Sequence, residues 1–416
     1  MSEVNAEGSA APMEERPGII EMLKESGPAF LAGGLNIGGA SITNAVLLAS
    51  ATGFLFGWVF FLATLAVWVA TLACVKISIV TGKNPISVMI QDVHPIIGWA
   101  NGIAILLVNL VFHTVQVVLG AAVLHTLFPG ISQTIWGFIF VVLVAAFVLT
   151  PRRSTLLETV LKVLIYGLTV AFVLSLFVVP IDWGQVGTMF RFTLPTDAGA
   201  VLLFTAVLGS ALAINVPTIQ GYGSVTRTWG VKNFRVFRFE TALTNLLLLF
   251  SSLAVMIVVG STLFAEGVEV TSAVQAAQAL EPLAGDFAAI LFSVALFAAV
   301  FTTAGVQTLV SGYIVSDLAG WKPEIKDVKF KVVQIVMLLV ALSVPLFNLN
   351  PFEWVAWGAA FNSTFMPIGI ATWWYLINKT SLLGKYRANP LMNVGLAVAM
   401  LIAVTAAVRF WYVTLT

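Results

Sequence analysis

Hydrogen-bonding side chains and glycines gather inside two long apolar stretches of the sequence. The first stretch, residues 27–50, carries the pairs Gly33–Gly34 and Gly38–Gly39 together with Asn36 and Ser41. A glycine costs a helix interior about 1 kcal/mol relative to alanine. A helix that breaks at mid-bilayer would explain two such pairs, because its freed backbone groups can line a cavity and hold a solute. Glycines that only allow two helices to pack closely are the alternative.

The second stretch, residues 199–225, is interrupted by Pro217 and carries Asn215, Thr218 and Gln220. These two stretches are the most interrupted in the chain, and each opens a group of five apolar runs. Two successive groups of five have opposite orientations in a membrane. The pattern therefore predicts an inverted repeat whose broken helices, the first and the sixth, meet near the midplane.

The composition sets the class of protein. Of 416 residues, 59% are hydrophobic and 9% are charged, and the mean hydropathy is +1.01. Soluble domains carry roughly 25% charged residues. We therefore expect an all-α polytopic membrane protein with about eleven transmembrane helices. The predicted spans are 28–50, 54–80, 98–124, 132–150, 156–180, 199–225, 240–264, 284–316, 331–347, 353–377 and 391–414.

Basic residues predict the orientation of the chain. Most of the 20 Lys and Arg residues fall on one side of the membrane if the N-terminus is cytoplasmic, as expected for cytoplasmic loops. This predicts a multi-pass protein of the plasma (inner) membrane with an odd number of spans. We expect a cytoplasmic tail at 1–26 and one transporter domain at 27–416. Within that domain we expect repeat one at about 27–180, repeat two at about 195–378 and an extra helix at about 391–414.

Several function classes are excluded by composition. One cysteine and three histidines leave no material for a disulfide framework or a His/Cys metal cluster. No nucleophile–base pair that would indicate an enzyme is visible within the spans. No basic patch dense enough for nucleic acid occurs. We expect no cofactor, and membrane lipid as the surrounding medium.

Segments spread along nearly all of residues 27–412 resemble a known family. They are GPAF (Gly27–Phe30), the stretch from ATGF to TGKNP that ends the second span, PRR (Pro151–Arg153), RFET (Arg238–Thr241), LEPLAG (Leu280–Gly285) and LLGKYRANP (Leu382–Pro390). With these segments the chain resembles the Nramp family of divalent-metal transporters. The resemblance implies the LeuT-type fold with five-plus-five inverted repeats.

The functional motifs of the family are missing. Its first-span Asp-Pro-Gly-Asn falls at Gly38–Ser41, and its sixth-span Met-Pro-His falls at Ala213–Asn215, with a second histidine at Gln220. The third-span acidic pair falls at Thr114 and Val117. A tenth-span glutamine falls at Ala360, close to Asn362. The resemblance implies a shared scaffold without the family's metal ligands.

The groups that remain suggest a different substrate. Divalent sites in proteins supply carboxylates, or thiolate and imidazole for softer ions, and neither interruption carries one. Half-helix N-termini, hydroxyls and carboxamides can instead donate to a small oxyanion. A small monovalent anion or a compact neutral solute fits these groups best. We expect the anion, and the resemblance to the family branch without metal ligands implies bicarbonate. The predicted substrate residues are Asn36, Gly38, Gly39, Ala40, Ser41, Ala213, Asn215, Thr218 and Gln220.

Anion uptake predicts a coupling cation, because accumulation against an inside-negative potential costs about 2.3 kcal/mol per charge per 100 mV. The third span lacks the acidic pair for protons, whereas Na⁺ needs only carbonyl and hydroxyl oxygens. By resemblance to sodium-coupled LeuT-type transporters, we expect Na⁺ between Thr302, Thr303 and the backbone from Gly34 to Ile37. Both threonines can instead bond back to their own helix carbonyls.

The leading hypothesis is therefore a Na⁺-coupled secondary transporter that imports a small anion by alternating access. The alternative is a divalent cation transporter of the Nramp type, for Mn²⁺ or Mg²⁺, with an altered ion site that uses carbonyl oxygens and a partly hydrated ion. A channel or a non-transporting membrane scaffold is a third class. The clustered polar groups of the two interrupted spans argue against a scaffold.

Overall fold

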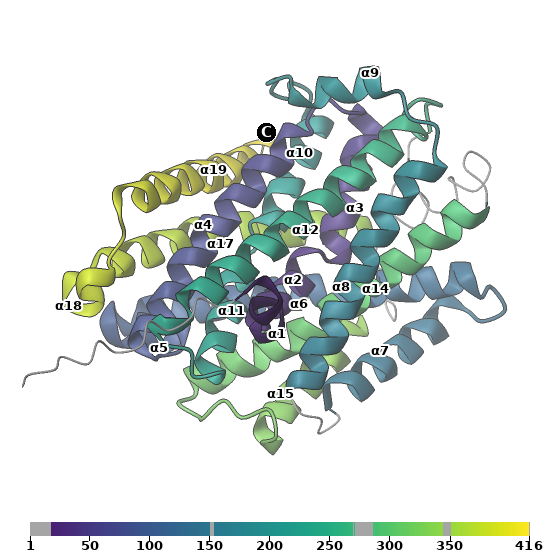
Figure 1. The fold of residues 1–416 in the computed structure, drawn as a ribbon. Helices are drawn as coiled ribbons and strands as arrows, with labels where there is room; N and C mark the ends of the chain where they lie inside the picture. Colours follow the sequence, from purple (N-terminus) through teal and green to yellow (C-terminus); the bar gives the residue numbers. More distant parts are fainter. Residues whose placement is uncertain (1–17, 150–153, 269, 271–285, 344–350, 416) are drawn as a thin grey trace, which may run out of the picture.

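The computed structural model describes residues 18–149, 154–268, 270, 286–343 and 351–415, and every regular element in these ranges is a helix (Figure 1). The first half contains α1 (Ile19–Glu25), α2 (Pro28–Asn36), α3 (Gly39–Thr52), α4 (Trp58–Thr81), α5 (Pro85–Asp92), α6 (Pro95–Leu127), α7 (Gln133–Leu149), α8 (Ser154–Val178), α9 (Trp183–Val186) and the 3₁₀ turn η1 (Gly187–Phe190). The second half contains α10 (Ala198–Ala211), α11 (Asn215–Thr226), η2 (Val231–Asn233), α12 (Phe234–Ser261), α14 (Asp286–Leu318), α15 (Val328–Ala341), α17 (Pro351–Asn378), α18 (Thr380–Leu383), η3 (Gly384–Tyr386) and α19 (Pro390–Leu415).

The predicted polytopic helical architecture is confirmed, and each predicted span falls on one helix or on a pair of half-helices. Among the described helices, six are long and apolar enough to cross a membrane, and α2 with α3 adds a seventh span broken by a bend of 41°. The interruption between α10 and α11 differs, because residues Gly199–Thr226 pass as a single span of 28 residues. Of the expected tail 1–26, residues 1–17 lie outside the described residues, and α1 occupies most of the rest.

The bundle has two ends, which we name by the short helices that lie there. At the α9 end lie α9, η1 and the C-terminal end of α19 (Figure 1). At the α5 end, α2, α6, α12, α15 and α19 begin and α4, α11, α14 and α17 end. A hydrogen bond from Lys379 Nζ to the Asp92 carbonyl (2.5 Å) joins the end of α17 to the end of α5.

Helices α6 and α14, of 33 residues each, are the two longest described helices, and they pack against each other through the bundle. Both also contact α2 or α3 at the first break. Proline at the first turn of α2, α5 and α6 suits helix starts, where its missing N–H leaves no bond unmade. The two long helices therefore form the wall against which the interrupted helices lie.

Candidate functional site

The first break, between α2 and α3, can pack closely against α6 and α14 because it carries two glycines. A Cβ at Gly38 would lie 2.3 Å from Thr303 Oγ1, and a Cβ at Gly39 would lie 2.2 Å from Val300 Cγ1 and 2.6 Å from Gln116 Oε1. Neither glycine has a positive φ. The glycines are thus required for close approach to α14 and α6, so the break and the close packing are one feature rather than alternatives.

The second break, between α10 and α11, is braced by a side chain from α17. Asn362 Oδ1 accepts a hydrogen bond from the Ile214 backbone N–H (3.1 Å), and Asn362 Nδ2 donates to the carbonyls of Leu212 (3.1 Å) and Gly209. These are backbone groups that the interruption leaves without partners inside the helix. A fully buried asparagine therefore satisfies the broken span from outside it.

A chain of hydrogen bonds runs from the second break into the wall. Asn215 Nδ2 donates to Asn109 Oδ1 (2.5 Å), and Asn109 Nδ2 donates to Ser311 Oγ (3.3 Å), whose hydroxyl donates to the Gln307 carbonyl (2.9 Å). Because that last acceptor is a backbone carbonyl, the direction of every bond is fixed. The chain therefore leaves Asn215 Oδ1 free as an acceptor.

Seven buried carboxamide oxygens have no hydrogen-bond partner within the described part of the chain, those of Asn36, Asn101, Gln116, Asn215, Asn245, Gln307 and Gln334. Three of them lie at the breaks or beside them: Asn36 at the end of α2, Gln116 on α6 and Asn215 at the start of α11. These side chains are at most 3% exposed. Gln116 Nε2 is also unpaired, so acceptors outnumber donors among these unpaired amide atoms. Unpaired buried acceptors are costly unless a ligand or water occupies the space between them. We call Asn36, Gln116, Asn215 and Asn109 the central polar cluster.

Acidic side chains lie elsewhere. Among the residues that the structure describes, no three His, Cys, Asp or Glu side chains are grouped as metal ligands would be. Glu240 and Asp317, which contact the half-helices α2 and α11, both lie toward the α5 end, and Asp197 caps the far end of α10, at its first turn. The central polar cluster itself is therefore neutral.

Glu240, on α12, holds the start of α2. Its carboxylate is fully buried and accepts hydrogen bonds from the backbone N–H groups of Gly27 (2.8 Å) and Ala29 (3.1 Å). It also accepts from Gln220 Nε2 of α11 (3.2 Å). A carboxylate at a helix N-terminus is favoured by the helix dipole and by the free N–H groups there. Glu240 therefore ties α2 to α11 and α12.

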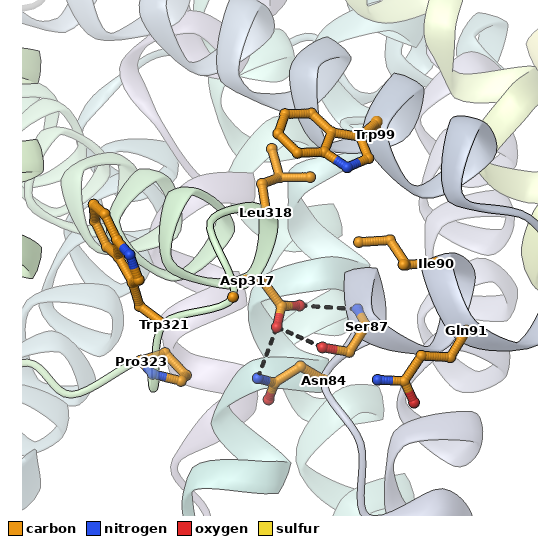
Figure 2. Close-up of a pocket in the computed structure, with 10 residues that line it drawn as sticks. Asn84, Ser87, Ile90, Gln91, Trp99, Asp317, Leu318, Trp321 and Pro323 are labelled. Atoms are coloured by element: carbon orange, nitrogen blue, oxygen red, sulfur yellow. Dashed lines mark hydrogen bonds between the residues drawn. The ribbon is translucent and has the colours of Figure 1, made fainter.

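Asp317, near the end of α14, holds the last part of α11 in the same way. It accepts hydrogen bonds from Tyr222 Oη of α11 (2.8 Å), from the Ser87 backbone (2.9 Å) and hydroxyl (2.6 Å), and from Asn84 Nδ2 (3.2 Å). Figure 2 shows the bonds to Ser87 and Asn84. Two half-helices, α2 and α11, are thus each tied by a carboxylate at the α5 end.

The predicted substrate residues separate into groups. Asn36, Gly38, Gly39 and Asn215 lie at the breaks, where Gly39 meets Gln116 of the cluster. Ala213 lies in the α10–α11 interruption. The structure brings these residues to the ends of the half-helices, and their contact with a substrate stays a prediction.

The other predicted substrate residues are engaged elsewhere. Ala40 packs on Val108 and Phe112, and Ser41 lines a separate cavity of about 10 Å³ between α3, α4, α10 and α12. Thr218 Oγ1 donates to the Ile214 carbonyl of its own helix (2.9 Å). Gln220 Nε2 donates to Glu240 and, at 2.6 Å, to Thr241 Oγ1. Their predicted roles in binding remain untested.

The residues predicted to hold Na⁺ are partly together. Thr303 Oγ1 lies 2.7 Å from the Gly34 carbonyl and 2.8 Å from the Ala299 carbonyl. Thr302 instead lies within hydrogen-bond distance of the carbonyls of Ala298 and Ala299 in its own helix. Ile37 caps α2, with its N–H on the Gly33 carbonyl. The Thr303 hydroxyl therefore contacts the Gly34 carbonyl as expected, and Na⁺ binding between them stays a prediction.

Four polar residues of this region are absent from the predicted set: Asn109 and Gln116 on α6, Gln307 on α14 and Asn362 on α17. Asn109, His113 and Gln116 share a spacing of four and three residues, and Thr303, Gln307 and Ser311 repeat every four. Polar residues at this period inside an apolar helix mark one face. That signal was available in the sequence.

Comparison with known proteins identifies the family. The family model for natural resistance-associated macrophage protein-like (Nramp) proteins matches residues 29–413. The chain belongs to the Nramp family. It is a multi-pass membrane transporter of that family, as the resemblance implied.

Relatives and solved structures agree with this assignment. The divalent metal cation transporter MntH of Yersinia pestis is 25% identical over 310 residues, which cover 73% of this chain and 75% of that protein. The crystal structure of a manganese transporter mutant of Eremococcus coleocola has a TM-score of 0.76 at 15% identity and covers 95% of this chain and 88% of that one. The structure of MhsT in complex with L-phenylalanine has a TM-score of 0.62 at 14% identity, over 93% and 97%. These likenesses show the LeuT-type fold.

One prediction is wrong. The sequence led us to expect a small inorganic anion, bicarbonate, as the partner of this chain, whereas the Nramp relatives are named as transporters of divalent metal cations. The physical error lay in counting donors. The prediction counts hydroxyls and carboxamides as free donors, but Thr218, Asn215 and Gln220 donate within the protein. The oxygens of Asn36 and Asn215 remain unpaired.

Proposed function

We propose that this chain transports a divalent metal cation across the membrane and that the ion keeps part of its water shell in the central polar cluster. The observation that carries the proposal is the set of unpaired carboxamide oxygens at Asn36, Gln116 and Asn215. Oxygen acceptors attract cations and the hydrogens of their bound water. Family membership supports the same class of substrate.

Neutral oxygen ligands favour hard cations. Carbonyl, carboxylate and water oxygens suit Mg²⁺ and Mn²⁺, whereas softer transition metals prefer thiolate and imidazole. Mg²⁺ gives up water reluctantly and is held by few protein ligands while several waters remain. A neutral cluster without a carboxylate therefore fits Mg²⁺ best, and Mn²⁺ is the second candidate.

The half-helix ends supply further attraction for a cation. Helices α2 and α10 end at the breaks with Asn36 and Ala211, and a helix C-terminus carries a partial negative charge. Backbone carbonyls at such ends coordinate cations in transporters with broken helices. These dipoles offset part of the cost of holding a doubly charged ion without a carboxylate.

Alternating access would move the ion between the two ends of the bundle. We take the α5 end as cytoplasmic, because basic residues gather in the segments there and Arg191 follows η1 at the other end. This supports an N-terminus on the cytoplasmic side of the plasma membrane. Residues 27–180 and 195–378 would rock against each other as inverted repeats, with Glu240 and Asp317 closing the cytoplasmic side.

The driving force follows from the charge of the substrate. Entry of a cation into a negative interior is favoured by about 2.3 kcal/mol per charge per 100 mV. A divalent ion therefore needs no coupling cation to enter, and the electrostatic reason for Na⁺ disappears. Coupling to Na⁺ near Gly34 and Thr303 remains open to direct measurement.

The test is uptake of Mg²⁺ and, separately, Mn²⁺ into proteoliposomes with an inside-negative potential. We expect Mg²⁺ uptake that is faster than Mn²⁺ uptake and that does not need a Na⁺ gradient. Asn36→Ala should weaken it. Asn245→Ala should not, because it also removes a buried, unpaired carboxamide oxygen, but from α12 rather than from a break. Absence of flux of both ions in the unaltered, folded protein would overturn the proposal.

A further inference from the structure

A cavity of about 470 Å³ opens at the α5 end between α5, α6 and the end of α14. Figure 2 shows its lining: Asn84, Ser87 and Gln91 on one side, Asp317 at the centre, the indole of Trp99 on α6, and the indole of Trp321 on the segment that follows α14. Trp99 is 46% exposed and Trp321 is 37% exposed. Tryptophans at this level are typical of the membrane–water interface.

Asp317 gives this cavity a negative charge. The hydrogen bonds from Tyr222, Ser87 and Asn84 satisfy its oxygens, and no ion pair to it occurs among the described residues. Hydrogen bonds from neutral donors do not cancel the charge. The carboxylate therefore favours a cationic group in the cavity.

A positive charge lies near one indole. Lys329 Nζ is 4.9 Å from the ring centroid of Trp321, which lines the cavity. Trp321 follows the end of α14, four residues after Asp317 in the sequence. The cavity thus has a carboxylate within it and an ammonium group beside it.

An apolar groove of about 440 Å³ continues from the cavity along the bundle. Its lining side chains are Ile103, Leu106, Leu107 and Leu110 of α6, Val315 of α14, and Val332, Val333, Val336 and Met337 of α15. The two hollows adjoin, because Trp99 of the cavity and Ile103 of the groove are four residues apart on α6. Val315 and Leu318 are three apart on α14. A polar hollow with opposite charges therefore opens onto an apolar one along two membrane-spanning helices.

We propose that the cavity and groove together bind a phospholipid with an ammonium headgroup, such as an ethanolamine or choline lipid. Its acyl chain lies in the groove, and its ammonium lies at Asp317 between the indoles, where a carboxylate and aromatic faces both attract cations. Its phosphate lies toward Lys329. An anionic lipid without an ammonium would bring its charge against Asp317, and a free amine would leave the groove unfilled.

The test measures the lipid that stays on the full-length protein. The protein is exchanged into vesicles of phosphatidylethanolamine, phosphatidylcholine and phosphatidylglycerol in equal parts, purified in mild detergent, and its retained lipid is measured by mass spectrometry. We expect ammonium-headgroup lipids to be enriched about fivefold over phosphatidylglycerol. The same measurement shows which of the two ammonium lipids is held.

Two variants separate headgroup from chain. Leu107→Trp fills the groove while Asp317 and its hydrogen bonds remain, and it should lower the amount of retained lipid. Asp317→Asn should remove the headgroup preference. Leu339→Trp, at an exposed position of α15 outside the groove, is the matched control and should retain lipid as the unaltered protein does. Retained lipid with the vesicle composition, or full retention in Leu107→Trp, would overturn the proposal, independently of any transport measurement.

Discussion

The central polar cluster and the α5 end treat buried polar groups in opposite ways. At the centre, the oxygens of Asn36, Gln116 and Asn215 are neutral and unpaired. At the α5 end, the carboxyl groups of Glu240 and Asp317 accept hydrogen bonds from several helices. The hydrogen bonds at the α5 end hold the half-helices, whereas the unpaired oxygens at the centre form the ligand site that we propose.

This difference bears on how the protein can move. Hydrogen bonds to a charged acceptor contribute about 1.5–3 kcal/mol each, against about 1 kcal/mol for neutral pairs. Opening the α5 end must break several hydrogen bonds at Glu240 and at Asp317. Reshaping the centre exchanges neutral contacts for water or ion contacts. The hydrogen bonds that hold the half-helices therefore gather at the α5 end, away from the central polar cluster.

The largest expected effect comes from removing Glu240. Glu240→Ala deprives Gly27, Ala29 and Gln220 of their acceptor, and we expect opening of the α5 end to become easier by about 3 kcal/mol. The single cysteine reports this, since Cys74 is 1% exposed and a Cβ at Gly221 of α11 would lie 3.5 Å from its Sγ. Its labelling by a thiol reagent should accelerate on the order of a hundredfold.

Glu240→Gln keeps one carbonyl acceptor and should give an intermediate labelling rate. Glu324→Ala, in the exposed pair with Lys322, serves as the control and should label as slowly as the unaltered protein. If Glu240→Ala left Cys74 protected, the α5 end would be closed by contacts other than this carboxylate.

Gly39→Ala tests the wall of the central cluster. The added methyl would lie 2.2 Å from Val300 Cγ1 and 2.6 Å from Gln116 Oε1, so the break must shift away from α6 and α14, at a cost of about 2 kcal/mol. Cation uptake should fall by more than tenfold. Gly33→Ala is the comparison, because its methyl would meet the movable end of Ile165 at 3.3 Å. Equal uptake in the two variants would contradict this account of the first break.

Asn215→Ala tests the acceptor side of the cluster. It removes an unpaired oxygen and leaves Asn109 Oδ1 without its donor, so we expect uptake to fall about tenfold, the effect of about 1.4 kcal/mol. Thermal stability should change little, as should uptake in Asn245→Ala. A loss of folding equal to the loss of uptake would assign Asn215 a structural role only.

The fold could be predicted from the sequence because apolar run length and glycine interruptions are local signals. The span that breaks at Gly38–Gly39 and the span interrupted before Asn215 lie where expected. Substrate class was a different matter. It depends on which donors and acceptors are already used, and a hydroxyl such as that of Thr218 shows its partner only when the carbonyl beside it is known.

Hydrogen-bond partners that lie far apart in the sequence could not be predicted from it either. Glu240 meets Gly27 across 213 residues, and Asn362 meets Ile214 across 148. Nothing in either local sequence names the other. The periodic polar faces of α6 and α14 were visible, yet their meaning depends on which helices face each other. Local patterns thus located the breaks, and only the packed structure showed which polar groups tie helices together and which remain unpaired.

The smallest expected effect comes from removing the contact between Thr303 of α14 and Gly34 of α2. Thr303 Oγ1 reaches the Gly34 carbonyl from α14, whereas Thr302 bonds within its own helix, so the two variants Thr303→Ala and Thr302→Ala differ by one contact between helices. That contact contributes about 1 kcal/mol, and uptake in Thr303→Ala should fall about fivefold while Thr302→Ala stays unchanged. Measured in Na⁺ and in K⁺ media, the loss should be the same, because the hydroxyl positions α2 in both. A loss confined to Na⁺ medium would instead place a coupling ion between Gly34 and Thr303, and the central cluster would then hold a second cation site.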